Sequence, residues 1–297
     1  MEVMIDCIPC HIRQAISAAR SILDDNEEIS EAVEKVLKKA SCFKDYDTNF
    51  RLYVEINDII KEMSNGKDPY REQKKKFNDI CLSLEDELIS KIKDSKKPFE
   101  TAVRIALAGN VIDIMQGLEH GLGSVRASIE KAFSQEMDEC SFMELRSYIE
   151  EAKNILYIGD NAGEIVFDKI FIDHIIESGL VSKKEIIFAV RGGPTINDVT
   201  VEDADYVGLS DMIKVIDTGA ELPFAYLPFC SKSFNEAYKD SDLVISKGMG
   251  NFEGLMKEED KDIFFLLKIK CGPIQKVIGN GTNLNDIIIL KKSDHQY

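Results

Sequence analysis

Four turns rich in polar residues follow apolar segments in the second half of the chain. They occupy residues 159–164, 191–198, 217–220 and 247–253. Asp160, Asn161 and Asp198 in these turns offer carboxylate and amide oxygens, which Mg²⁺ and Mn²⁺ prefer as ligands. Arg191 and Lys247 each come directly after an apolar segment, and cations beside a metal can neutralise charge on a transferring phosphoryl group. These residue types therefore predict metal-dependent phosphoryl chemistry.

Each of these residues also has a simpler interpretation. Asp160 could act as the N-cap of the helix that follows it. Arg191 and Lys247 could form salt bridges with Asp160 or Asp198, which is compatible with a role toward substrate. Glu253 could bind metal, orient water or cap a helix, and the sequence does not rank these roles.

The apolar segments before the turns are short and lack polar alternation. The candidate strands are residues 154–158, 185–190, 214–216, 243–246, 263–267 and 286–290. Such runs are typical of parallel strands that are covered on both faces. Helical segments such as 164–178 and 231–240 lie between them, so the pattern predicts a three-layer α/β/α, Rossmann-like domain with a mostly parallel sheet. Ligands bind beyond the carboxyl ends of strands in such sheets, so the polar turns should converge on one site.

The first half of the chain has a different periodicity. Apolar residues at spacings of three and four predict helices at residues 13–23, 29–39, 50–63, 70–92, 99–118 and 125–133. Pro69 and Pro98 suit first-turn positions, with Asp68 as a candidate N-cap. We therefore predict an all-α helical bundle or cap domain at residues 1–150 and an α/β domain that binds metal and phosphate at residues 151–297.

Composition narrows the class of protein. Of 297 residues, 44% are hydrophobic and 30% are charged, which fits a globular chain with a sizeable core. The formal net charge of -16 disfavours nucleic acid as a partner. No run of about 18 apolar residues predicts a membrane span. The acidic N-terminus lacks the basic start of a secretory signal, so we expect a cytoplasmic location. The sequence does not define an oligomeric state.

Several familiar catalytic motifs are missing from the turns. No Gly-x-x-x-x-Gly-Lys-Ser/Thr loop occurs, and residues 159–164 lack the Gly-x-Gly-x-x-Gly of dinucleotide binders. An Asp-x-Asp motif of the kind found in aspartate-nucleophile phosphatases is also missing after the first strand. A metal-activated water is therefore favoured as the attacking group, with Asp160 as nucleophile the alternative.

The turns together resemble the signature motifs of the DUF89 family of damage-control phosphatases, also called the ARMT1-like family. The matching segments are Gly-Asp-Asn-Ala-Gly-Glu at 159–164, Arg-Gly-Gly-Pro at 191–194 with Asn197-Asp198, and Lys-Gly-x-Gly-Asn-x-Glu at 247–253. Further matches lie at residues 68–70, 108–113 and 270–273, and Cys7-x-x-Cys10 resembles the N-terminal motif of the smaller microbial members.

The resemblance implies metal-dependent hydrolysis of small phosphomonoesters, such as sugar phosphates or damaged phosphometabolites, in an α/β/α domain beside a helical domain. It implies a divalent cation, Mn²⁺, Mg²⁺, Ni²⁺ or Co²⁺, held by Asp160, Asn161 and Asp198. Substrate-facing positions would be Asn110, Asp113, Arg191, Lys247 and Glu253, and catalytic positions would be Asp160, Asp198, Lys247 and Arg191. Asn110 and Asp113 are three apart on a helix and share a face. They could instead be a buried polar pair that joins the two domains.

Cys7 and Cys10 leave other functions open. A Cys-x-x-Cys pair can bind zinc or act in redox chemistry, although no second pair supplies the remaining zinc ligands. The pair could also have a structural or family-specific role near the active site, with Cys271 as a possible neighbour. The rival functions are therefore a metal-binding or redox-sensing protein built on Cys7 and Cys10, or a carboxyl methyltransferase, for which no convincing Gly-rich nucleotide loop is present.

Overall fold

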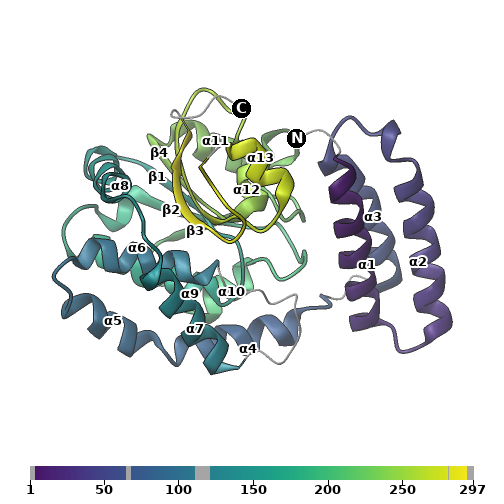
Figure 1. Cartoon of the computed structure of the whole chain (residues 1–297), viewed down its shortest axis with the longest axis horizontal. Coiled ribbons are helices and arrows are strands. Elements are labelled where there is room, and N and C mark those ends of the chain that lie inside the picture. Colours follow the sequence, from purple (N-terminus) through teal and green to yellow (C-terminus); the bar gives the residue numbers. More distant parts are fainter. Residues whose placement is uncertain (1–3, 65–67, 111–120, 280, 293–297) are drawn as a thin grey trace. The chain divides into compact units, whose positions relative to one another are not determined.

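The chain divides into two compact units in the computed structural model (Figure 1). The structure describes residues 4–64, 68–110, 121–279 and 281–292. The units are Met1–Arg71 and Glu72–Tyr297. The sequence-based boundary near residue 150 instead marks the point where helices give way to alternating strands and helices. The helices between residues 72 and 151 belong to the same compact unit as the sheet.

The first unit contains three helices, α1 (Ile8–Ile22), α2 (Asn26–Ser41) and α3 (Asn49–Ser64). Their apolar residues at helical spacing are buried, as at Ala19, Val36 and Ile56. The buried His11 ring of α1 lies with Nε2 2.7 Å from the Oδ1 atom of Asn49 in α3. This contact gives His11 a structural partner within the first unit.

Among the described residues of the second unit, five α-helices precede the sheet. They are α4 (Arg71–Leu82), α5 (Glu85–Lys93), α6 (Pro98–Gly109), α7 (Leu122–Ser134) and α8 (Glu139–Glu151). Pro98 occupies the first turn of α6, as predicted. The segment predicted as one helix at 70–92 forms α4 and α5, and most of the predicted helix beyond Gly109 lies outside the described residues. Helix α8 was not among the predicted segments.

Six strands form one sheet. They are β1 (Ile155–Ile158), β2 (Ile186–Val190), β3 (Lys214–Asp217), β4 (Leu243–Lys247), β5 (Asp262–Lys268) and β6 (Ile287–Lys291). Their order is β3-β2-β1-β4-β5-β6, and all pairs are parallel except β5 with β6. Each strand lies within one residue of its predicted bounds at either end. The prediction of a mostly parallel sheet is confirmed.

Helices cover both faces of the sheet. The helices that alternate with the strands are α9 (Glu164–Glu177), α10 (Val201–Tyr206), α11 (Lys232–Asp240), α12 (Gly248–Leu255) and α13 (Gly272–Ile278). One face packs on α6 and α9, where Tyr157 lies against Phe171 and Phe188. The other face packs on α12, where the Phe252 and Phe265 ring centroids are 5.0 Å apart. The predicted three-layer architecture is therefore confirmed.

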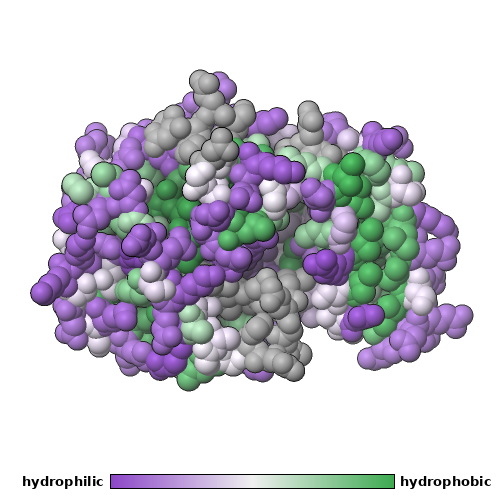
Figure 2. Space-filling view, viewed as in Figure 1, coloured by the Kyte–Doolittle hydropathy of each residue, from purple (hydrophilic) through white to green (hydrophobic). Residues whose placement is uncertain are grey.

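The surface agrees with the charged composition. Hydrophilic side chains cover most of the face shown in Figure 2. Among the described helices, none is long and apolar enough to cross a membrane.

Candidate active site

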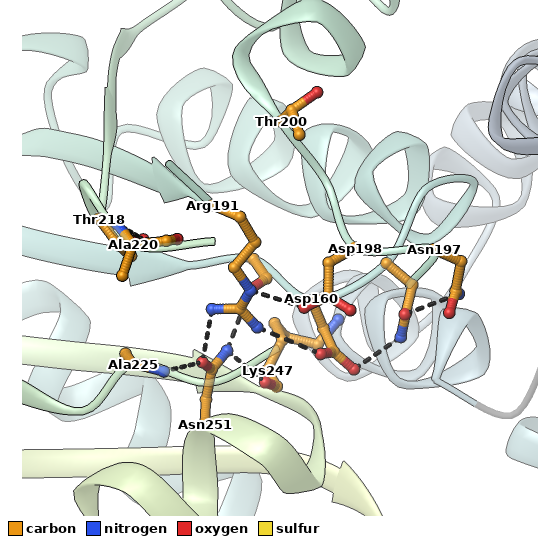
Figure 3. A network of polar contacts seen from close by, with 12 residues as sticks. Asp160, Arg191, Asn197, Asp198, Thr200, Thr218, Ala220, Ala225, Lys247 and Asn251 are labelled. Atoms are coloured by element: carbon orange, nitrogen blue, oxygen red, sulfur yellow. Dashed lines mark hydrogen bonds and ion pairs between the residues drawn. The ribbon is translucent and has the colours of Figure 1, made fainter. Parts of the chain in front are cut away.

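The strand order reverses beside β1, which pairs with β2 on one side and β4 on the other. Doubly wound sheets bind their ligands at such a switch point, beyond the carboxyl ends of the strands. The turns after β1 and β2 are joined there by backbone hydrogen bonds. The N–H of Ala162 donates to the carbonyl of Asn197 at 2.9 Å, and the N–H of Val199 donates to the carbonyl of Asp160 at 3.0 Å. These bonds bring Asp160 and Asp198 together (Figure 3).

Special backbone conformations shape these turns. Gly163, the N-cap of α9, and Gly248, the first residue of α12, have φ angles of 77° and 76°. A Cβ atom at Gly248 would overlap the carboxylate of Asp160, so only glycine fits there. Ile196 has a φ of 43°, which is strained for a β-branched residue and marks a turn that its surroundings over-determine.

Arg191 lies between the two candidate carboxylate ligands. Its Nε donates to Asp198 Oδ2 at 2.6 Å, and its Nη2 lies 3.5 Å from Asp160 Oδ1. Its Nη1 donates to Asn251 Oδ1 at 2.8 Å. Arg191 therefore forms the salt bridges that the sequence left open as its alternative role. Asp160 does not cap α9, because Gly163 holds that position.

Two amide side chains surround Asp160. Its Oδ2 accepts from Asn161 Nδ2 at 2.7 Å and from Asn110 Nδ2 at 3.1 Å. The Oδ1 of Asn161 accepts from Asn197 Nδ2 at 2.7 Å. The oxygen of Asn161 is thus turned toward Asn197, and its amide would have to rotate to serve as a metal ligand. Asn110 is fully buried at the end of α6 and also accepts the N–H of Lys268 at 2.9 Å, which ties α6 to the sheet.

Lys247 has partners other than those the sequence suggested. Its Nζ lies 2.7 Å from Glu164 Oε1 and donates to Asp168 Oδ1 at 2.5 Å and to the carbonyl of Ala106 at 2.9 Å. The contacts with Asp168 and Ala106 are hydrogen bonds, whereas the contact with Glu164 is an ion pair. The side chain is fully buried. Lys247 therefore pairs with Glu164 and Asp168 and not with Asp160 or Asp198, and its role toward substrate stays a prediction.

Burial and mutual repulsion perturb the acidic groups. Burial raises the pKa of Asp160 to about 8, and the charges of Asp198 and Glu164 add to the rise. Arg191 and Lys270 oppose it. Burial also raises the pKa of Asp198, against the lowering effect of Arg191. Clusters of perturbed carboxylates at a sheet edge are typical of functional sites.

The cluster contains more negative than positive charge. Burial raises the pKa of Asp168 to about 6, although the nearby Lys247 ammonium lowers it. Four buried carboxylates share the site with two buried cations. The carboxylates are Asp160, Glu164, Asp168 and Asp198, and the cations are Arg191 and Lys247. Fully ionised, this set lacks two positive charges, which is the charge of a divalent cation.

Sequence reasoning did not assign roles to Glu164, Asp168 or Tyr157. The hydroxyl of Tyr157 donates to Asp168 Oδ1 at 2.7 Å, so the cluster extends beneath β1. A usable signal existed, because Asp168 is a charged residue within the largely apolar segment that forms α9 and stands four residues after Glu164. Unpaired charges are rarely buried, so such a residue predicts a buried cation nearby.

The other predicted positions lie around or outside this cluster. Glu253 is half-buried on α12, and Asp113 lies outside the described residues. The turn after β3 packs on the turn after β2, where the N–H of Gly192 donates to the carbonyl of Ala220 at 2.9 Å. That turn adds no charge to the cluster.

The cysteine pair lies at the start of α1, where Cys7 is half-buried and Cys10 is exposed. Within the described part of the chain, no group of three or more His, Cys, Asp or Glu side chains is arranged to hold a metal ion. The zinc and redox roles of Cys7 and Cys10 stay predictions. The set of Asp160, Asn161 and Asp198 contains two carboxylates and an amide, so this finding does not test it.

The fold and site define a doubly wound α/β protein with a cluster of buried acidic side chains at its switch point. Residues 3–284 match the family described as the damage-control phosphatase ARMT1-like domain. The chain belongs to this family, DUF89, as the signature turns predicted.

Individual relatives agree. A damage-control phosphatase of Pyrococcus horikoshii is 34% identical over 279 residues, which cover 93% of this chain and 94% of the relative. An uncharacterised protein of Methanocaldococcus jannaschii is 32% identical over 304 residues, which cover 98% of this chain and 96% of the relative. The crystal structure of a DUF89 family protein from Pyrococcus horikoshii superposes with a TM-score of 0.86 at 30% identity and covers 98% of this chain and 99% of that chain.

Proposed function

We propose that the protein is a phosphatase that hydrolyses small phosphomonoesters, such as sugar phosphates or damaged phosphometabolites, with a divalent cation at the switch point. The observation that carries the proposal is the excess of buried carboxylate over buried cation around Asp160 and Asp198. Buried charge of one sign is costly unless a counter-charge compensates it. The names of the family and of its Pyrococcus horikoshii relative support the reaction class.

The donor groups fit a hard divalent cation such as Mn²⁺, Mg²⁺, Ni²⁺ or Co²⁺. Asp160 and Asp198 would hold it through carboxylate oxygens, and Asn161 would join them after rotation of its amide. A cation bound there polarises a phosphoryl oxygen and lowers the pKa of a water molecule. Arg191 holds both carboxylates in place from the side of β2.

Other residues of the chain would receive the substrate. Lys270 is exposed, and its charge lowers the pKa of Asp160, so it lies close enough to attract a phosphate group to the site. Asn251 is fully buried and fixes the guanidinium of Arg191, so it positions this residue rather than contacting substrate. Positively charged groups near the centre offset charge on the transferring phosphoryl group.

The first experiment tests the reaction itself. We expect the purified chain, stripped with a chelator and then dialysed, to hydrolyse p-nitrophenyl phosphate and members of a sugar-phosphate panel only after a divalent cation is restored. Phosphate release would be measured with each of the four cations. Equal activity before and after stripping would contradict the role of the metal, and no hydrolysis of any phosphomonoester would contradict the reaction class.

Metal affinity should depend on pH because of Asp160. Burial raises the pKa of this carboxyl group to about 8 in the metal-free chain, so a proton occupies it at lower pH. A cation must displace that proton, and affinity should therefore rise about tenfold per pH unit between about pH 6 and pH 8, then level off. Calorimetry with Mn²⁺ in buffers of different ionisation enthalpy measures the affinity and the proton release together. Affinity that is independent of pH, with no proton released, would contradict the assignment of Asp160.

A further inference from the structure

Two buried polar side chains on α4 contact the turns that carry the candidate metal ligands. Lys74 and Asn78 stand one helical turn apart and are 4% and 1% exposed. Asn78 Oδ1 accepts the N–H of Gly163 at 2.6 Å, three residues after Asp160. Lys74 Nζ donates to the carbonyl of Asp198 at 3.3 Å. Helix α4 thus holds both the turn after β1 and the turn after β2 through hydrogen bonds.

Asp203 of α10 completes this arrangement. Its Oδ2 accepts from Lys74 Nζ at 2.8 Å, and its Oδ1 accepts from Asn78 Nδ2 at 3.1 Å. Its Oδ2 also accepts from the N–H and the hydroxyl of Thr200, each at 2.9 Å. Thr200 follows Asp198 by two residues, so the chain at Asp198 and just after it is held to α4 through Lys74 and Asp203.

The energetics do not favour a purely stabilising role for this pair. Burying a Lys and an Asp costs desolvation that their attraction often fails to recover, and apolar side chains of similar size frequently stabilise a protein as well or better. Lys74 instead donates to the carbonyl of Asp198. Asn78, which donates to Asp203, accepts the N–H of Gly163, three residues after Asp160. Outer residues of this kind orient metal ligands in many metalloproteins.

We infer that Lys74, Asn78 and Asp203, here called the α4 clasp, are positioning residues that set the spacing between Asp160 and Asp198 for a divalent cation. The inference rests on the proposed function, because it assumes that these carboxylates bind the cation. It adds to that function a contribution from a helix that carries none of the candidate ligands.

The test replaces the charged pair as a unit. The double variant Lys74→Met/Asp203→Asn leaves no unpaired charge and keeps an acceptor for Thr200, but Asn78 loses its acceptor on residue 203. We therefore expect only a small fall in melting temperature. We expect its dissociation constant for Mn²⁺ to rise about 10- to 100-fold, and the Mn²⁺ concentration for half-maximal activity to rise in parallel. The value of kcat at saturating Mn²⁺ should change far less. The single variant Lys74→Arg keeps the positive charge, so it should retain most of the wild-type affinity for Mn²⁺.

A matched control uses the pair of Lys169 on α9 and Glu85 on α5, whose Nζ and Oε1 atoms are 2.9 Å apart and lie away from the turns. Lys169→Met/Glu85→Gln should leave the Mn²⁺ affinity unchanged. Wild-type affinity in the Lys74→Met/Asp203→Asn variant would overturn the inference, as would a loss of melting temperature without a change in affinity. Failure of the wild type itself to bind Mn²⁺ would overturn the proposed metal site, and failure to hydrolyse phosphoesters would overturn the proposed reaction.

Discussion

Asp160→Asn should reduce kcat/KM at least about a thousandfold while leaving the protein folded, because several kcal/mol of transition-state stabilisation depend on the cation that this carboxylate would hold. Asn has nearly the same shape, so the packing around Asn110 and Arg191 should persist. Phosphate release with saturating Mn²⁺ and the far-ultraviolet circular dichroism spectrum would be measured on the same preparation.

The same variant gives a stability signature whose sign can be derived. Burial raises the pKa of Asp160 to about 8 in the folded chain, whereas an unfolded Asp titrates near about 4. The folded state therefore binds more protons between these pH values, and the stability of the metal-free wild type falls as pH rises through that range. Asp160→Asn lacks this loss. The melting temperature of the variant minus that of the wild type should therefore increase from pH 5 to pH 8.

A carboxylate at the same edge of the sheet provides the control. Asp217 ends β3, is exposed, and accepts the N–H of Gly219 at 2.7 Å. Asp217→Asn keeps Asp160, so it should retain nearly full activity, and its melting temperature should follow that of the wild type from pH 5 to pH 8. Retained activity in Asp160→Asn, with Asp217→Asn also active, would remove Asp160 from the site.

The strands and the meeting of two turns were predictable from the sequence because the signals are local. Short aliphatic runs such as 155–158 fix the strands. Because parallel strands end at the same edge of a sheet, the turns after β1 and β2 are expected at one edge, where ligands bind. The proximity of Asp160 and Asp198 follows from that topology. Their hydrogen-bonded partners do not, since Asn110 reaches Asp160 across 50 positions of sequence.

The division into compact units and the α4 clasp were not predictable. Helical periodicity shows which face of a helix is apolar but not which element covers it, so residues 72–150 could not be assigned to the sheet. Helix α4 reads as a Lys-rich amphipathic segment, and nothing local separates Lys74 from its exposed neighbours Lys75 and Lys76. Lys74 meets Asp203 across 129 positions, a contact that packing alone decides.

Lys247→Met tests whether Lys247 is the counter-charge of the buried carboxylates Glu164 and Asp168. The variant leaves Glu164 and Asp168 buried without the ammonium group that compensates them. Loss of one partner from a buried ion pair costs about 3–5 kcal/mol, which for a domain of this size lowers the melting temperature by roughly 10 °C. A lysine that only contacts substrate would instead raise KM with little change in melting temperature. Scanning calorimetry and steady-state kinetics on one preparation separate these results.

A double variant tests whether the uncompensated carboxylate of Asp168 destabilises Lys247→Met. Because burial raises the pKa of Asp168 to about 6, this carboxyl group can take up a proton once the lysine is gone. The stability that Lys247→Met loses should therefore be smaller at pH 5 than at pH 8. Lys247→Met/Asp168→Asn should recover part of the loss at pH 8, because one uncompensated charge is removed.

Lys232→Met, which breaks only the exposed pair with Glu236, should change the melting temperature little. If Lys247→Met behaves like Lys232→Met at both pH values, Lys247 does not compensate the buried carboxylates beneath the site.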